Sequence, residues 1–281
     1  AFQVNVGLNT TVLGSGWGAG TWGRFTWGSA SGSLAGQTLR LFSVDNFGED
    51  LVFNIADGSI FYWDATNGVS NRAVRLDSLT GASDVPSVAR QILVSDVDRH
   101  IIVFGTNPVG TGLLDPLLIR FGSQESLVDF TPTATNTAGD LRLSKGSEII
   151  TAIQTSRQIL VFTDQSLYSM QFIGPPFTFG VSLLGDNIRI AGPNTAIAVN
   201  DIVFWMGQEN FYLYDGRIQT LPCSVRDYVF NDMNNQQSFK FHSGSIGSQT
   251  EIWWFYVSSG ATEIDRYVVY NYGQRIWYYG T

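Results

Sequence analysis

Short runs of β-branched and aromatic residues, bounded by Gly, Asn, Asp, Ser or Pro, recur from one end of this chain to the other, while helical periodicity is almost absent. This pattern is typical of an all-β protein. Only 14% of the residues are charged, against a usual value of about 25%, and 14% are aromatic, so disorder is excluded. The longest apolar runs, such as Ile252 to Val257, are far shorter than the roughly 18 residues that span a bilayer, so we expect no membrane-spanning segment.

The runs fall into five successive groups of four, whose first strands are spaced by about 45 to 60 residues. The expected strands are Leu39 to Val44, Asp50 to Ile55, Ser59 to Asp64 and Arg72 to Leu76; Val88 to Ser95, His100 to Thr106, Pro116 to Phe121 and Ser126 to Phe130; Glu148 to Gln154, Gln158 to Thr163, Leu167 to Ile173 and Phe177 to Leu183; Ala196 to Val199, Asp201 to Met206, Phe211 to Tyr214 and Arg217 to Leu221; Phe239 to Ser245, Thr250 to Val257, Asp265 to Asn271 and Arg275 to Tyr279.

A four-stranded unit that repeats at this period predicts a β-propeller, in which each blade buries its faces against its neighbours. We therefore expect one propeller domain over residues 37–281, with five countable blades and room for a sixth. A large β-sandwich or two smaller β-domains would give a similar strand count. One short helix is expected near Val225, Tyr228 and Val229.

Residues 1–36 differ from the rest, because they are rich in Gly, Ser and Thr and carry Trp17, Trp22 and Trp27 at intervals of five. We expect an extended N-terminal arm that packs on its own or a neighbouring subunit through these three indoles, since large apolar side chains gain little unless buried. Such an arm could also add a strand that closes the ring. A flexible linker is the alternative, although linkers rarely carry three tryptophans.

The residue types that carry most catalytic and metal chemistry are scarce in this chain. His100 and His242 are the two histidines, neither has a neighbour at metal-ligand spacing, and Cys223 is the one cysteine. Gly14 to Gly18 lacks the strand-to-helix context of a nucleophile elbow, and no phosphate-binding motif is present. We expect no catalytic residues, no metal, no cofactor and no enzymatic activity.

The net charge of −8 argues against a protein that grips nucleic acid, because phosphate binding requires a basic face. Most acidic residues lie near strand ends, where turn chemistry explains them. Among them, Asp96, Asp98 and Asp201 are the candidates for acidic side chains that face a central channel. Ordinary solvated turns are the alternative interpretation of these three.

Several runs resemble the tail hub or nozzle proteins of short-tailed bacteriophages, also known as packaged-DNA stabilisation proteins. They are Asp45 to Leu51, Val203 to Gly207 followed by Phe211 to Gly216, Leu221 to Val225, Asp265 to Tyr272, and the Gly16 to Gly23 part of the arm. The resemblance covers nearly the whole chain and includes no catalytic motif. Members of the family are usually longer, so this chain would correspond to their central propeller region.

The resemblance implies a virion tail protein that is assembled in the host cytoplasm. Its copies would form a ring, typically a hexamer, below the portal and its adaptor, contact other tail proteins and continue the DNA-ejection channel. DNA would pass through without specific binding, because six copies carry roughly −48 in total, six times −8, and acidic walls repel phosphate. The alternative is a carbohydrate-binding or glycosidase-type β-propeller, in which exposed Trp would bind sugars and paired carboxylates would hydrolyse them.

Overall fold

The computed structural model of the chain describes residues 11–12, 35–36 and 40–281. Its contacts divide the chain into two compact units, Ala1–Leu41 and Phe42–Thr281. In the first unit, β1 (Thr11–Val12) pairs with β2 (Ala35–Gly36) in antiparallel fashion. The three tryptophans of the expected arm lie outside the described residues, so its packing stays a prediction.

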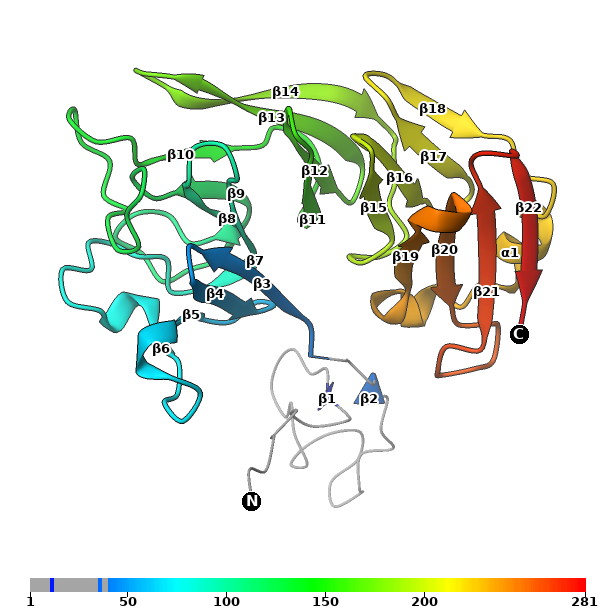
Figure 1. Cartoon of the computed structure of the whole chain (residues 1–281), viewed down its shortest axis with the longest axis horizontal. Helices are drawn as coiled ribbons and strands as arrows, with labels where there is room; N and C mark the ends of the chain where they lie inside the picture. The colour runs from blue at the N-terminus through cyan, green and yellow to red at the C-terminus, as the bar shows by residue number, and fades with distance from the viewer. Residues whose placement is uncertain (1–10, 13–34, 37–39) are drawn as a thin grey trace, which may run out of the picture. The chain divides into compact units, whose positions relative to one another are not determined.

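The second unit consists of five four-stranded antiparallel sheets, each with its strands in chain order (Figure 1). The sheets are β3 (Phe42–Phe47), β4 (Asp50–Ile55), β5 (Ile60–Trp63), β6 (Val74–Arg75); β7 (Ala89–Val94), β8 (Ile101–Thr106), β9 (Asp115–Phe121), β10 (Gly139–Arg142); β11 (Ile149–Gln154), β12 (Ile159–Thr163), β13 (Ser166–Gly174), β14 (Thr178–Asp186); β15 (Ala196–Val199), β16 (Ile202–Met206), β17 (Phe211–Tyr214), β18 (Ile218–Leu221); and β19 (His242–Ile246), β20 (Glu251–Tyr256), β21 (Arg266–Asn271), β22 (Ile276–Gly280). We call them blades 1 to 5.

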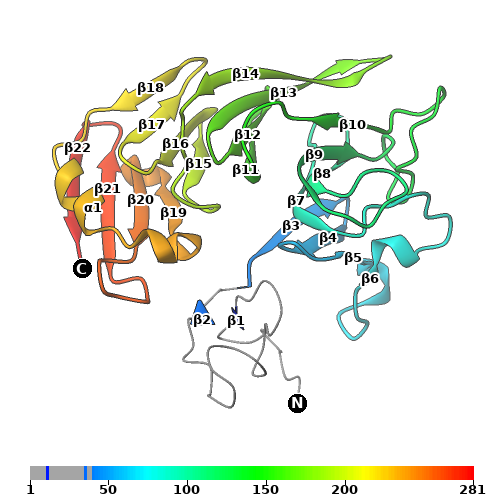
Figure 2. The same ribbon diagram turned by 180° about the vertical axis from the view of Figure 1, so that it is seen from behind.

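The first strand of each blade adjoins the first strand of the next, in the order β3, β7, β11, β15, β19. These inner strands run around one axis, and the blades radiate from them, as the view from behind also shows (Figure 2). This arrangement confirms the β-propeller class and excludes a sandwich of two stacked sheets.

The sequence placed most of the strands correctly, with one clear error in blade 2. The expected strand from Ser126 to Phe130 is instead part of a loop, in which Asp129 forms a bridge with Ser83 and the carbonyl of Phe130 accepts a 3.1 Å hydrogen bond from Arg120 of β9. The fourth strand is β10, whose Gly-Asp-Leu-Arg sequence has little β propensity. As an edge strand it needs only one partner, and its Arg142 binds Asp115 of β9 across the ladder, with Nε 2.7 Å from Oδ2.

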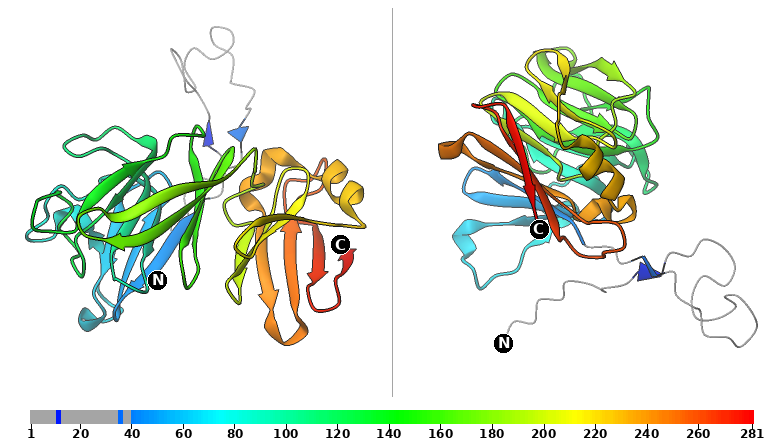
Figure 3. Two further views of the ribbon diagram at one scale, coloured as in Figure 1. Left: turned by 90° about the horizontal axis from the view of Figure 1, so that it is seen from above. Right: turned by 90° about the vertical axis from the view of Figure 1, so that its right-hand side faces the viewer.

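The α-helix of the second unit, α1 (Arg226–Asp232), lies where the sequence predicts it, between blades 4 and 5. Val229 is fully buried, and Val225 occupies the N-cap position. The side views show α1 beside the last blade (Figure 3). The remaining helical elements are the short 3-10 turns η1 (Ala65–Asn67), η2 (Leu76–Ser78), η3 (Asn235–Lys240) and η4 (Gly247–Gln249).

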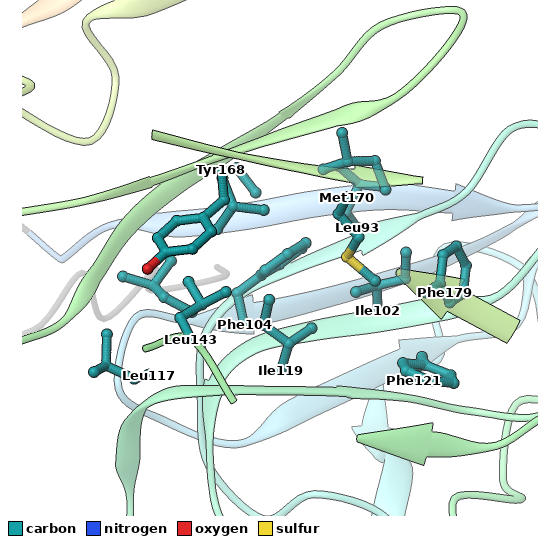
Figure 4. Close-up of a cluster of buried hydrophobic side chains, with 14 residues drawn as sticks. Leu93, Ile102, Phe104, Leu117, Ile119, Phe121, Leu143, Tyr168, Met170 and Phe179 are labelled. Carbon is teal, nitrogen blue, oxygen red and sulfur yellow. The ribbon is translucent and has the colours of Figure 1, made fainter. Parts of the chain in front are cut away.

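Apolar side chains fill the space between neighbouring blades. In one such cluster, Ile102, Phe104 and Ile119 of blade 2 meet Tyr168 and Met170 of blade 3 (Figure 4). Middle strands that lie between two blades are buried on both faces: every residue of β8 and of β12 is buried. Since burying one such side chain contributes about 1.5–3 kcal/mol, these interblade clusters dominate the stability of the fold.

Candidate functional site

Each inner strand turns into the second strand of its blade, and the predicted channel acids lie in two of these five turns. We call residues 48–49, 95–100, 155–158, 200–201 and 247–250 the rim turns. Contacts join the ends of blades 1 and 2, and likewise those of blades 3 and 4, at these turns. The guanidinium of Arg99 in blade 2 lies 5.2 Å from the ring centroid of Phe47 in blade 1, and Ser156 of blade 3 donates to Asp201 of blade 4.

Asp201 links two blades through its carboxylate. It lies in a tight hairpin turn with Asn200, and both residues have positive φ, 50° and 63°. Its Oδ1 accepts a 2.9 Å hydrogen bond from the backbone N–H of Ser156, and its Oδ2 accepts one of 2.5 Å from the Ser156 hydroxyl. These bonds lower the pKa of Asp201 below its ordinary value. The residue is exposed and ionised, so it stays a candidate for a channel-facing acid.

Asp98 does not face a channel, and that prediction is corrected. Its side chain is only 4% exposed, and its Oδ1 lies 3.4 Å from Nδ1 of the fully buried His100. Desolvation alone would raise the pKa of Asp98, but interactions with His100 and Ser95 outweigh it and lower the pKa. The turn from Ser95 to His100 therefore directs this carboxylate into the interior, where it lies beside the histidine.

His100 belongs to a buried polar chain that sequence reasoning missed. Its Nε2 lies 3.0 Å from the hydroxyl of Thr137, which also accepts a 2.8 Å bond from the backbone N–H of Gln124. The ring packs against Phe179, with centroids 5.2 Å apart. The Asp98-x-His100 spacing was visible in the sequence, but no sequence signal connects these residues to Thr137, which lies in the loop before β10.

An acid, a histidine and a hydroxyl in line resemble a nucleophilic triad, yet here the arrangement is structural. A nucleophile must reach a substrate, and the histidine is 0% exposed while the Thr137 oxygen is already engaged by a backbone donor. These polar contacts connect the rim turn of blade 2 with the loop before β10. Thr178 of blade 3 extends these contacts, since its hydroxyl donates to the carbonyl of Thr137 at 3.0 Å.

Basic side chains balance the exposed acids of the rim turns. Asp96 and Glu49 are exposed, as are Arg99 and Arg157, so the described rim carries both signs of charge. Whether Asp96 faces the channel stays a prediction. At the start of the inner strands, Arg90 bridges three blades: its Nε lies 2.7 Å from Asp57 of blade 1, and its Nη2 lies 2.9 Å from Glu148 of blade 3.

Two expected absences concern metal and membrane. Across residues 40–281 and the two short described strands, no group of three or more His, Cys, Asp or Glu side chains could hold a metal ion. In the same described part of the chain, no helix has the length and apolarity needed to cross a membrane.

Comparisons with known proteins identify the fold alone. No protein-family model and no curated protein matches the chain. The extracellular domain of the putative one-component system BT4673 from B. thetaiotaomicron is similar over 85% of this chain and 27% of its own, with a TM-score of 0.51 and 11% identity. BamB from Moraxella catarrhalis covers 88% of this chain, with 63% of BamB matched, a TM-score of 0.46 and 12% identity.

An ancestral enzyme of glycoside hydrolase family 74 matches 85% of this chain and 34% of its own, with a TM-score of 0.48 and 12% identity. The chain thus spans about a quarter of the BT4673 domain and less than two thirds of BamB. The similarity to the BT4673 domain concerns the fold alone. These similarities carry no statement about activity.

Proposed function

We propose that this protein is a structural component of a bacteriophage tail, in which copies form a ring around the path of the ejected DNA. The resemblance to tail hub and nozzle proteins motivates the proposal. Two of the resembling runs, Val203 to Gly207 and Phe211 to Gly216, form the β16–β17 hairpin at the centre of blade 4. They form two adjacent strands of a blade.

The observation that carries the proposal is that many aspartates have lowered pKa values and therefore keep their negative charge. Hydrogen bonds and ion pairs lower the pKa of aspartates spread over the blades, so these groups stay ionised in mildly acidic as well as neutral solution. They are Asp64, Asp115, Asp164, Asp186, Asp201 and Asp265. A surface that keeps its negative charge repels phosphate, so a duplex slides past it without adhering.

Many of the basic side chains that could bind phosphate form ion pairs with carboxylates. Both lysines are paired: Nζ of Lys145 with Asp186, and Nζ of Lys240 with Glu263 at 2.7 Å. Arg120 is 1% exposed and is held by Asp84 at 2.8 Å. Each pair neutralises one cation and one carboxylate, so the pairs reduce the number of free cations while the net charge stays at −8, which supports a conduit over a DNA-binding protein.

The test combines an image and a binding measurement on the purified chain. Negative-stain electron microscopy should show rings, and duplex DNA should not bind at about 20 mM salt, where electrostatic attraction is least screened. Tight DNA binding at that salt would refute the conduit. Hydrolysis of a host-surface polysaccharide would instead favour the carbohydrate-active alternative.

A further inference from the structure

Each of the two end blades of the unit has one face that packs on no neighbouring blade among the described residues. Burial in blade 1 alternates along β3 and β4, so that Val52 and Asn54 are buried while Phe42 and Val44 are 54% and 59% exposed. The buried face packs on blade 2 through Val52 and its neighbours. The middle strands β8 and β12, in contrast, are buried on both faces. One face of blade 1 therefore lacks a neighbour among the described residues.

This outer face of blade 1 is built like an interblade surface. Pairing across the sheet aligns Phe42 with Ile55, Val44 with Phe53, and Phe53 with Phe61. The rings of Phe53 and Phe61 stack with centroids 5.4 Å apart. Rows of apolar side chains on one face of a sheet are a liability in water and normally mark a packing surface.

Blade 5 has the corresponding open face at the other end. Trp254 and Ile252 belong to the cluster shared with blade 4 and are fully buried. On the opposite face Trp253 and Phe255 are partly buried, while Val269, which pairs with Trp253, is fully buried within blade 5 itself. Trp253 stacks on Tyr267, with centroids 5.0 Å apart. The aromatic rows of this outer face also belong to no interblade cluster of the described residues.

The polar edge of the inner strands shows how successive blades join. Ser43 Oγ and Asp45 Oδ2 of β3 accept 2.9 and 2.8 Å bonds from the backbone N–H groups of Ile92 and Val94 in β7. The amide of Gln91 in β7 bonds the N–H and the carbonyl of Ala152 in β11, at 2.7 and 2.9 Å. The same interface thus repeats, with apolar faces and a polar inner edge, and no comparable contact joins β19 to β3.

We propose that the outer faces of blades 5 and 1 form a docking site for one further four-stranded antiparallel blade, apolar on both faces and supplied by polypeptide outside residues 42–281. The site continues the interface that already joins blades 1 to 5. It is independent of the proposed tail function.

A second copy of the chain does not fit this site. The five blades already turn through most of a circle (Figure 1). If blade 1 of a second copy packed on blade 5 in the same manner, its other four blades would follow the same circle and overlap the first copy. A single blade fills the opening without this conflict.

Distances between spin labels on the rim turns test the proposal. Label pairs on blades whose separation is known within this protein provide the reference distances. With the single Cys223 replaced by Ala, spin labels are placed on Glu49→Cys and Ser248→Cys, which are exposed rim positions of blades 1 and 5. The pair Glu49→Cys and Asp96→Cys reports adjacent blades. The pair Glu49→Cys and Arg157→Cys reports blades 1 and 3, which have one blade between them.

Two fusions supply the docking blade, each adding a second copy of a chain segment after Thr281 through a flexible linker. One repeats residues 194–222, which contain blade 4, and the other repeats residues 147–190, which contain blade 3. In at least one fusion, the labels at 49 and 248 should give a single narrow distance that matches the pair at 49 and 157. In the unfused chain the distribution should be broader.

Three results would overturn the proposal. The labels at 49 and 248 could match the adjacent-blade pair in the unfused chain, which would mean that blades 1 and 5 pack directly. A second such result is that neither fusion narrows the distribution of distances between the labels at 49 and 248. The third result concerns two variants of the fusion. Val44→Lys, on the outer face of blade 1, should broaden the distribution of distances between the labels at 49 and 248, whereas Val69→Lys, 88% exposed in a loop, should leave it unchanged. Equal effects of the two substitutions would contradict docking on this face.

Discussion

Replacing Asp98 by Asn removes one charge from the interior while keeping the shape of the side chain. Asp98 and His100 are both buried, and their facing atoms lie 3.4 Å apart. Interactions with the charged carboxylate lower the pKa of Asp98 in the folded state, so Asp98→Asn should lower the free energy of unfolding at pH 7, by about 0.5–3 kcal/mol. Asp96→Asn, two residues away and exposed, is the matched control and should stay within about 0.5 kcal/mol of the parent.

The pH dependence of this effect has a definite sign. The pKa of Asp98 is lowered in the folded state, so its stabilisation is present above the ordinary carboxyl pKa of about 3.9 and is lost as the pH falls through the folded value. The difference between the parent and Asp98→Asn should therefore be full at pH 7 and should shrink below about pH 4.

Urea titrations of the parent and both variants, followed by circular dichroism, would measure the effect. Midpoints are compared directly, because a chain of five blades need not unfold in one step. Equal midpoints for Asp98→Asn and Asp96→Asn at pH 7 would refute the reasoning. So would a difference that persists undiminished at pH 2.

Three further changes test the interblade contacts. Arg90→Met should cost about 1 kcal/mol in urea unfolding, less in 1 M NaCl, because Asp57 and Glu148 are half exposed and salt screens such pairs; a salt-independent loss would contradict this. Gly192→Ala should destabilise by about 1–3 kcal/mol, because its Cβ would lie 2.2 Å from the carbonyl oxygen of Ser238, whereas Gly244→Ala meets no atom within 4 Å and serves as the control. Trp254→Phe should lower the melting temperature by about 2–8 °C, since it removes a buried 2.9 Å bond to the Thr195 carbonyl at a cost of about 1–2 kcal/mol; an unchanged melting temperature would show that this bond is dispensable.

Much of the fold follows from local sequence because each blade is a set of consecutive hairpins. Asp50–Ile55, Phe211–Tyr214 and the short helix α1 lie where residue type and turn chemistry predict them. The strand that the sequence did not predict is β10, an edge strand of low β propensity. Its pairing with β9 and the ion pair between Arg142 and Asp115 hold it in the sheet. Pairing with a distant neighbour is invisible to a local pattern.

The candidate site was less predictable, since side-chain direction in a turn depends on tertiary contacts. Asp96 and Asp98 share one turn and one residue type, yet one is exposed and the other is buried against His100. Thr137, which completes that contact, lies 37 residues from the histidine and is brought there by the loop before β10. Sequence alone supplies neither the direction of the carboxylate nor its partner.

Each end blade packs on a neighbouring blade on one side only among the described residues, and this has a consequence for local opening. Contacts within a blade are short in sequence, and each blade leans only on its immediate neighbours, so such a molecule loses structure from its ends inward. Amide hydrogens of β4 and β21 should therefore exchange with solvent before those of β8, β12 and β16. The slowest-exchanging amides would mark the three central blades as the part that keeps its structure longest.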